Sequence, residues 1–475
     1  MLNKFVQTSL FDIYTQVQSQ AENNKSEFIK TLEKHLDFTQ IIPNSFYTAF
    51  YKRMGRPHKY ELESIIRAFV LQMLLGFTDS QLIIMLNISN ELKDFCGFTE
   101  VLDASILTKF KQQYVTHVET MFKNLVKITE PICREIDEKK ADYLIYDTTG
   151  IEPCVAENNP KFLNTKLNSA KQFSKSNPNY DPYKGVYSLL PDVSNTNPLL
   201  KHQYINGHFC YAFKAGILTN GLGVIRDITL FDEKFKKKHP EIVSQKTDNP
   251  DVDKEIGDSN SLKPVLSDFF SEHKDFNYGT FLGDSAFDSY DNFSMLKDDF
   301  KFSRACIPLN VRNSKSAFDN FDEFGTPLCP LDDTPFSYLG KSGGKNRSLR
   351  FKYVCHKSIA IGSTRVCTCE TPCTNSSYGK CAYTYPNKNF RMYPGIPRNT
   401  EHFDNLYRHR VVCERTINLI KGSFNLAKPK SYSINTIKFN LLFASITSLL
   451  TVILAKAINE PKYFKSTKSL VNLIA

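Results

Sequence analysis

Tryptophan is absent from the 475 residues, so any stacking on aromatic side chains must use the 23 tyrosines or the 37 phenylalanines. A secretory signal is also missing, because the apolar residues of the N-terminal stretch MLNKFVQTSLFDIYTQ are too interrupted for a signal h-region. The twelve cysteines include no CxxC pair. These absences argue against a secreted disulfide framework, and we expect a cytoplasmic protein whose cysteines are reduced or bind metal.

Long runs without charge are scarce. FNLLFASITSLLTVILA, residues 439–455, contains 17 residues without a charged side chain. A membrane span needs about 20 apolar residues, and this run also contains Asn, Ser and Thr. We therefore predict a buried core helix and no membrane partner. With 41% hydrophobic residues, the chain is long enough for two or more globular units.

Acidic residues are in the minority. Lys and Arg number 60 against 50 Asp and Glu, a net charge of +10. The excess is uneven, because residues 401–475 contain 11 basic and 4 acidic residues. This distribution predicts a polyanionic partner, although charge alone does not distinguish DNA from RNA.

The first 140 residues have the pattern of successive helices. ELESIIRAFVLQMLLG has apolar residues at helical spacing and stops at Gly76, and Thr78 is placed to cap the next helix, DSQLIIMLNIS. Asp103 or Ser105 could cap a third helix, SILTKFKQQYVTHVETMFKNLVKI. The early turns that we expect to be exposed carry Lys109, Lys111 and Gln112. Two interpretations remain open: a helix-turn-helix module whose third helix enters a DNA groove, or a plain helical bundle.

Strand patterns begin at Ala141. ADYLIYDTTG predicts a buried strand that ends in Asp147, and GHFCYAFKAGILTN with LGVIRDITLF predicts a hairpin through an Asn220-Gly221 turn. Residues 156–202 are rich in Asn, Lys, Ser, Tyr and Pro and predict a long loop, and 250–261 predict an acidic connector. A helix (LKPVLSDFFSEHK), a short strand before Asp284 and another helix follow. The order indicates a mixed α/β sheet.

Asp147 and Asp284 each follow a strand, so the two strand ends could bring their carboxylates together. A third carboxylate, Glu414, lies on a later helix. Clustered carboxylates raise one another's pKa unless cations lie between them. Mg²⁺ prefers such oxygen ligands, and two ions could stabilise both oxygens of an in-line phosphoryl displacement. The alternative for each aspartate alone is a turn residue at the end of a strand.

The stretch YRHRVVCERTINLIK, residues 407–421, places four polar residues on one side of a helix. At about 100° per residue, Tyr407, Arg410, Glu414 and Lys421 form a stripe about 60° wide and about 21 Å long. The opposite face carries Val412, Cys413, Leu419 and Ile420. Such a stripe could reach several phosphates of a nucleic acid, or it could be a solvated helix face with one ion pair.

These motifs together resemble those of a known family. Tyr407-x2-Arg410-x3-Glu414-x6-Lys421 resembles the Y-R-E-K signature of one large group of bacterial DDE insertion-sequence transposases. The segment DSAFDSY from Asp284 resembles the motif around the second aspartate of that group, and LIYDTTG resembles the strand with the first. Asp142 lies five residues from Asp147 and is the alternative first aspartate. The resemblance covers roughly residues 45–115 and 141–455.

The resemblance implies a DNA transposase that cleaves transposon ends and transfers the strand into target DNA. The metal-binding triad would be Asp147, Asp284 and Glu414 with Mg²⁺ or Mn²⁺. The residues that contact phosphates or terminal nucleotides would be Tyr407, Arg410 and Lys421. The implied partner is double-stranded DNA in a nucleoid-associated complex containing at least a dimer. Rival functions are an inactive DNA-binding protein derived from a transposase and a metal-dependent nuclease without strand transfer.

The resemblance also implies a domain order with an RNase H-like catalytic core. We expect a helical DNA-binding region (1–140), the first part of the core (141–308), a cysteine-rich insertion (309–400), and the catalytic and closing helices (401–475). Two features depart from the group. Some relatives stack a flipped base on Trp, which this chain lacks, and Glu414 lies 130 positions after Asp284, an interval that requires the insertion.

The insertion concentrates half of the cysteines. These are Cys329, Cys355, Cys367, Cys369, Cys373 and Cys381, and His356 is adjacent to one of them. We expect a structural Zn²⁺ that supplies folding energy, with free thiols and disulfides as alternatives. The candidate ligands are Cys355, Cys367, Cys369, Cys373 and Cys381. The basic residues of the segment, Arg347, Arg350, Lys352 and Lys357, could contact DNA or solvent.

Overall fold

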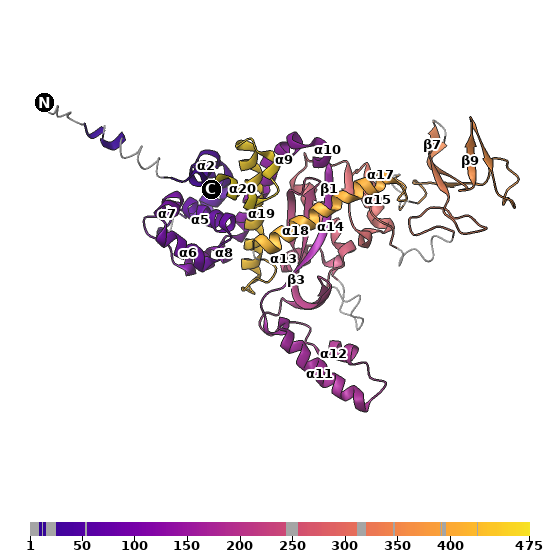
Figure 1. Cartoon of the computed structure of the whole chain (residues 1–475). Coiled ribbons are helices and arrows are strands. Elements are labelled where there is room, and N and C mark those ends of the chain that lie inside the picture. The colour runs from indigo at the N-terminus through magenta and orange to yellow at the C-terminus, as the bar shows by residue number, and fades with distance from the viewer. Residues whose placement is uncertain are drawn as a thin grey trace, which may run out of the picture. The chain divides into compact units, whose positions relative to one another are not determined.

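The computed structural model describes most of the chain and separates into two compact units (Figure 1). The described residues are 9–11, 13–15, 25–52, 55–243, 255–310, 320–344, 347–389, 391, 396–424 and 426–475; for 187–189 and 344 the structure describes the backbone alone. Unit 1 comprises Met1–Ile132, Ser423–Asn425 and Ile434–Ala475, and unit 2 comprises Cys133–Gly422 and Leu426–Ser433.

Unit 1 is helical. Its elements include α2 (Glu27–His35), α3 (Phe38–Ile41), α4 (Asn44–Phe50), α5 (Leu62–Leu75), α6 (Asp79–Ile88), α7 (Asn90–Cys96), α8 (Ala104–Gln113), α9 (Val115–Ile136), α19 (Ile434–Ala457), η6 (Pro461–Tyr463) and α20 (Thr467–Ile474). The predicted helix ends are confirmed. Gly76 ends α5 in the left-handed region, Thr78 forms a capping box with Gln81, and Asp103 caps α8.

The third predicted helix differs from the structure in two ways. It is divided at Tyr114, which leaves the helical region so that its ring packs against Phe46, Phe50 and Phe110. Lys111, which was predicted to be exposed, is only 3% exposed and pairs with Asp79 at 2.7 Å. A helical pattern cannot reveal this burial, because the acidic partner lies on another helix.

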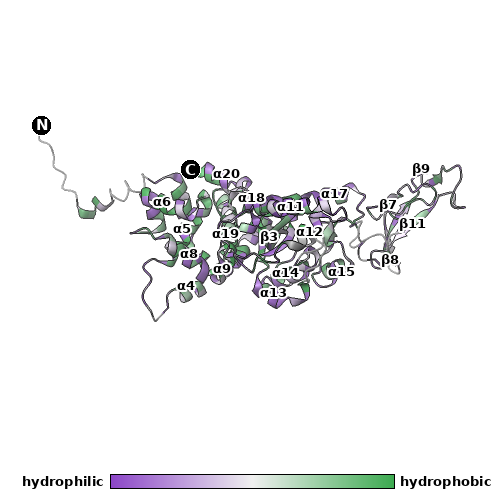
Figure 2. Cartoon of the chain, turned by 90° about the horizontal axis from the view of Figure 1, so that it is seen from below, coloured by the Kyte–Doolittle hydropathy of each residue, from purple (hydrophilic) through white to green (hydrophobic). Residues whose placement is uncertain are grey.

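The charge-poor helix α19 is the central helix of unit 1. It contacts α2, α5, α8 and α20, and the rings of Phe439 and Phe443 pack against Phe69. It is long and apolar enough to cross a membrane, but most of it is buried among these helices. Figure 2 colours the chain by hydropathy. The predicted buried core helix is confirmed, although it packs in unit 1 and not in the core to which we assigned the closing helix.

Unit 2 is built on a mixed sheet. Its strands are β1 (Tyr143–Ile151), β2 (Lys201–Ile205), β3 (His208–Asn220), β4 (Ile225–Leu230), β5 (Thr280–Leu282) and β6 (Arg304–Cys306). Their order is β2-β3-β1-β5-β6, and β4 pairs with β3. Pairs among β1 to β4 are antiparallel, whereas β1, β5 and β6 are parallel. The predicted mixed sheet and the β3–β4 hairpin are confirmed, and the Asn220 side chain accepts hydrogen bonds from two backbone amides of the turn.

Unit 2 also contains helical elements, and some of them pack on the sheet. They are α10 (Glu138–Ala141), η1 (Ala156–Asn158), α11 (Pro160–Ser176), α12 (Pro182–Leu189), α13 (Glu233–Lys238), η2 (Pro240–Ile242), α14 (Asp258–Glu272), η3 (Ser285–Phe287), α15 (Tyr290–Asp298), α17 (Glu401–Tyr407), η5 (Arg408–Arg410) and α18 (Val411–Ser423). Apolar residues of α14 and α15, such as Leu266 and Phe293, share one core with Leu144 and Phe281 of the sheet. Residues 250–254 of the predicted acidic connector lie outside the described residues.

The predicted loop at 156–202 is wrong, because it contains the paired helices α11 and α12 (Figure 1). Asn159 caps α11 by accepting a hydrogen bond from the Lys161 amide. Ala170 and Val186 are buried between the helices, with partly buried Leu167 beside them. The contact buries few apolar residues. The mostly polar composition of the segment therefore gives no sign of two packed helices.

The cysteine-rich segment forms two small sheets. One contains β7 (Ser337–Gly344), β8 (Arg347–Val354) and β11 (Cys381–Thr384), and the other contains β9 (Ser358–Ile361) and β10 (Thr364–Cys367). Among the described residues of the segment, the buried cluster consists of five side chains: Cys329, Phe336, Phe351, Tyr353 and Cys355. This core is very small for a segment of this length.

We predict that Asp79→Ala destabilises unit 1 by at least about 2 kcal/mol, because Lys111 then remains buried without its carboxylate. Glu100→Ala is the matched control, since Glu100 pairs with Lys59 on the surface, and it should cost less than about 0.5 kcal/mol. Urea unfolding followed by circular dichroism measures both effects. Equal destabilisation by the two substitutions would contradict the buried ion pair.

Candidate active site

Adjacent parallel strands bring Asp147 and Asp284 to one region of the sheet. Tyr143–Ile145 of β1 pair with Thr280–Leu282 of β5, and Asp284 follows β5 after one glycine. Asp147 was expected at the end of its strand, but β1 continues to Ile151. The Asp147 carboxylate therefore projects from within the strand, which continues because Leu144–Ile151 pair with the long strand β3.

The alternative first aspartate, Asp142, has a structural role. Its carboxylate accepts a hydrogen bond from the backbone amide of Gly279 at 2.9 Å, and a Cβ added to that glycine would approach Asp142 Oδ2 to 2.4 Å. This contact fixes the start of β5 beside β1. Asp142 therefore positions the strand, whereas Asp147 lies near Asp284.

The stretch 407–421 is helical but not one continuous α-helix. The 3-10 turn η5 (Arg408–Arg410) separates α17 from α18, so the stripe expected on an ideal helix is distorted. Buried Cys413 and Ile420 lie on the apolar face of α18, as predicted. Tyr407 stacks on Phe403 with ring centroids 5.8 Å apart.

Arg410 is the centre at which the three predicted carboxylates meet. Its Nη2 lies 3.1 Å from Asp147 Oδ2 and 3.7 Å from Asp284 Oδ2, and its Nη1 lies 2.6 Å from Glu414 Oε1. The Arg410 side chain is only 16% exposed. One guanidinium therefore contacts carboxylates that are separated by up to 267 positions of the chain.

The electrostatics of this cluster reflect burial and mutual repulsion. Burial raises the pKa of Asp147 to about 6, and the negative charge of Asp284 adds to the rise, while Arg410 opposes it. Burial lowers the pKa of Arg410, but the negative charges of the carboxylates, above all Asp147, have the larger effect. The Arg410 pKa is therefore raised. Burial also raises the pKa of Tyr407. Additional positive charge at this place would favour the ionised carboxylates.

A fourth carboxylate beside this cluster escaped the sequence analysis. Asp258, the first residue of α14, lines a polar cavity together with Asp147, Thr148, Lys214 and Asp284. Its Oδ1 lies 2.6 Å from the buried Lys214 Nζ and accepts a hydrogen bond from Thr148 at 2.5 Å. In the sequence, Lys214 lies in a predicted strand and Asp258 in a predicted connector. No sequence pattern links the two residues, so only the folded structure shows that they pair.

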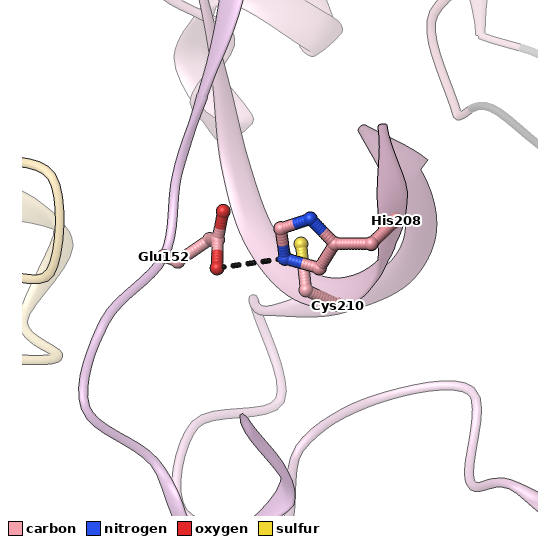
Figure 3. Close-up of side chains that lie close together, drawn as sticks. All are labelled: Glu152, His208 and Cys210. Carbon is pink, nitrogen blue, oxygen red and sulfur yellow. Dashed lines mark hydrogen bonds and ion pairs between the residues drawn. The ribbon is translucent and has the colours of Figure 1, made fainter. Parts of the chain in front are cut away.

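Lys421 occupies a different environment from Arg410. Its Nζ donates to Asn206 Oδ1 at 3.0 Å, and Asn206 Nδ2 donates to Glu152 Oε1 at 2.7 Å. Glu152 also lies 3.1 Å from His208 Nε2, as Figure 3 shows. Burial lowers the pKa of Lys421, and Glu152 partly offsets this effect.

The residues around Lys421 were missed by the sequence analysis. A signal for them was present, because Asn206-Gly207 is a favoured hairpin turn and both residues have positive φ. That turn joins β2 to β3 and places Asn206 beside Gly150, with which it exchanges two hydrogen bonds. Lys421 is thereby held at the turn of a hairpin.

Two groups of described residues have ligand atoms within 4.8 Å of one another. One comprises Glu152, His208 and Cys210 (Figure 3), and the other comprises Cys329, Asp332 and His356. The carboxylates around Arg410 are not among these compact groups. In the first group Glu152 already accepts a hydrogen bond from Asn206 and lies near Lys421, so its negative charge is balanced without a metal.

The five cysteines predicted to bind zinc are only partly brought together. Cys369 packs against the buried cluster that contains Cys329 and Cys355. Cys381 lies on β11 near Lys352, and Cys373 lies in a bend. All twelve cysteines are free, so the disulfide alternative has no support among them.

Residues 16–113 match a transposase domain. The matching family model carries the description Transposase domain (DUF772). No curated protein matches the chain. Among solved structures, the piggyBac transposase synaptic complex with hairpin DNA is similar with a TM-score of 0.37 and 8% identity, over 95% of this chain and 80% of that one.

We predict that Asp147→Asn stabilises the metal-free protein at neutral pH by up to about 2 kcal/mol. The raised pKa means that the folded chain favours the protonated carboxyl, so folding loses stability as the pH rises from about 4, the unfolded pKa, to about 6. Asparagine removes that loss. The difference in unfolding free energy between variant and wild type should therefore be small at pH 4, grow up to pH 6 and then level off. A constant difference across this range would contradict the buried carboxylate.

Proposed function

We propose that this protein is a DNA transposase whose catalytic carboxylates are Asp147, Asp284 and Glu414. The observation that carries the proposal is their convergence on the Arg410 guanidinium from β1, the end of β5 and α18. The transposase domain match at residues 16–113 supports the same class of activity. The mixed sheet with parallel β1 and β5 is compatible with an RNase H-like core.

The donor set fits divalent metal ions. Three carboxylates supply hard oxygen ligands, and the guanidinium among them marks a place where positive charge is stabilised. Asp147, Asp284 and Glu414 would hold Mg²⁺ or Mn²⁺ once the Arg410 side chain turns away from them. Bound metal would stabilise charge on the attacking and leaving oxygens of an in-line displacement.

Arg410 is suited to bind a DNA phosphate when it leaves the carboxylates. Its Nε is buried and has no hydrogen-bond acceptor among the described residues. A guanidinium matches the bidentate geometry of a phosphate group. Tyr407 and Lys421 would bind neighbouring parts of the backbone, and in this proposal DNA binding moves Arg410 from the carboxylates to the phosphate.

The proposed reaction has two displacements. Water first attacks a phosphorus at the transposon end, its oxygen bonds to phosphorus, and the bond to the 3′ oxygen breaks to leave a free 3′ hydroxyl. That hydroxyl then attacks a phosphorus of target DNA and releases a 3′ hydroxyl of the target strand. Joining two ends requires at least two copies of the chain, so we propose a dimer on DNA. The helices of unit 1 would bind the transposon ends.

We predict that Glu414→Gln lowers cleavage of transposon-end DNA by at least about 10³-fold and leaves end binding nearly intact. The probe is a duplex that carries the inverted repeat flanking the gene, incubated with Mg²⁺ or Mn²⁺. Glu401→Gln on α17 is the matched control, because this exposed carboxylate lies outside the cluster. Cleavage that survives in the Glu414 variant would overturn the catalytic assignment. Cleavage without strand-transfer products in the wild type would favour the nuclease alternative.

We predict that Lys421→Ala weakens binding of the same duplex and reduces the slope of log affinity against log salt by about 1. The reason is the loss of one phosphate contact at the hairpin turn that holds Lys421. Lys263→Ala is the control, because Lys263 of unit 2 is exposed and pairs with Asp299 on the surface. An unchanged salt slope for the Lys421 variant, measured by fluorescence anisotropy, would exclude a phosphate contact there.

A further inference from the structure

Helix α11 (Figure 1) carries a basic stripe that the proposed active site does not use. Intervals of three and four positions separate Lys161, Asn164, Asn168, Lys171 and Lys175, so these five residues share one face of the helix. All five are exposed. At about 1.5 Å per residue the face is about 21 Å long. We call these five residues the α11 stripe.

The apolar side of α11 is already covered within the same hairpin. Ala170 shares a buried cluster with Val186 and Leu190, and partly buried Phe162 and Leu167 pack against it. A helix that lies on a membrane inserts its apolar side among the lipids. In α11 that side is occupied by the α12 region, so the face left for a partner is the polar one.

Acidic residues are nearly absent from this hairpin. Residues 159–190 contain five lysines and one carboxylate, Asp181. Asp181 Oδ1 accepts a hydrogen bond from the Tyr183 amide at 2.9 Å, at the start of α12. In the part of the chain that the structure describes, no carboxylate pairs with a lysine of the α11 stripe. Other exposed lysines of unit 2 do have such partners, since Lys238 pairs with Asp268.

Hydrogen bonds anchor both ends of the hairpin. The Asn158 side chain donates to the Tyr211 carbonyl of β3 and accepts from the Tyr211 amide, each at 2.8 Å. The buried Glu157 carboxylate accepts from the Ser194 hydroxyl and from the Asn195 amide, each at 2.8 Å. The chain before α11 is thereby joined to β3 and to the chain after α12. An anchored helix loses little conformational entropy when it binds a partner.

We propose that the α11 stripe binds the phosphate backbone of duplex DNA. Lysine ammonium and asparagine amide groups donate hydrogen bonds to phosphate oxygens. Three cations without a carboxylate partner complement a polyanion. Phosphates recur about every 3.4 Å along one strand, so a face about 21 Å long spans about six of them. The choice of DNA over another polyanion rests on the proposed function.

This surface adds a DNA contact to those expected on unit 1 and around Lys421. The segment was predicted to be a loop, and in a loop the intervals between the three lysines have no meaning. Once Pro160–Ser176 is known to be a helix, the same intervals become one face.

The test measures binding of the full-length chain to a fluorescein-labelled duplex of random sequence, by anisotropy at several salt concentrations. Lys161→Ala/Lys175→Ala should weaken binding at least about 10-fold and reduce the slope of log affinity against log salt by about 2. Lys238→Ala/Lys263→Ala is the matched control. It removes the same charge from two exposed lysines that pair with carboxylates, and its slope should stay close to that of the wild type. Lys161→Arg/Lys175→Arg keeps the charge and should keep the slope.

A salt slope of the alanine variant equal to that of the wild type would overturn the proposal, as would an arginine variant that binds as weakly as the alanine variant. Vesicles containing phosphatidylserine test the membrane alternative. Vesicle binding that the alanine substitutions abolish while DNA binding stays unchanged would also overturn the proposal. If the double alanine variant does not fold, Lys161→Ala and Lys175→Ala decide the question singly, each with an expected slope change of about 1.

Cleavage is a separate readout. A wild type that never cleaves DNA but shows the expected loss of slope on alanine substitution would remove the proposed activity and support this surface. A wild type that cleaves transposon ends while the alanine variant binds DNA unchanged would keep the proposed activity and remove this surface.

Discussion

The ion cluster at Arg410 is the contact on which the catalytic proposal depends. A largely buried guanidinium neutralises carboxylates that would otherwise repel one another in a partly desolvated place. Because it pairs with three elements at once, it also ties η5 and α18 to β1 and to the end of β5. The same charge that stabilises the metal-free fold must be displaced before metal can occupy the site. Stability and activity therefore compete for the same carboxylates.

Much of this cluster could be predicted from sequence, since strand patterns place Asp147 and Asp284 near each other and helical spacing places Arg410 beside Glu414. What spacing could not predict is that Arg410 turns inward to the carboxylates while Lys421 is held in a separate network with Asn206 and Glu152. Helical periodicity describes an isolated helix, and here a 3-10 turn and neighbouring strands decide where each side chain points. The Asp258–Lys214 pair escaped for the same reason, because its partners come from distant elements.

Helix ends were predicted more accurately than helix exposure. Gly76, Thr78 and Asp103 act through hydrogen bonds to their immediate neighbours, so local sequence suffices to place them. Lys111 is buried by an aspartate of another helix, and α11 and α12 are stabilised by a few apolar residues in a polar segment. In both cases tertiary contact overrides composition.

The position of α19 in unit 1 has a consequence for how the chain must fold. The helices of residues 27–132 surround a helix that begins at Ile434, so the ribosome has to complete the whole of unit 2 before the N-terminal unit receives its central helix. Until then, the side chains that face α19, such as Phe69, have no partner helix to cover them and are open to chaperones.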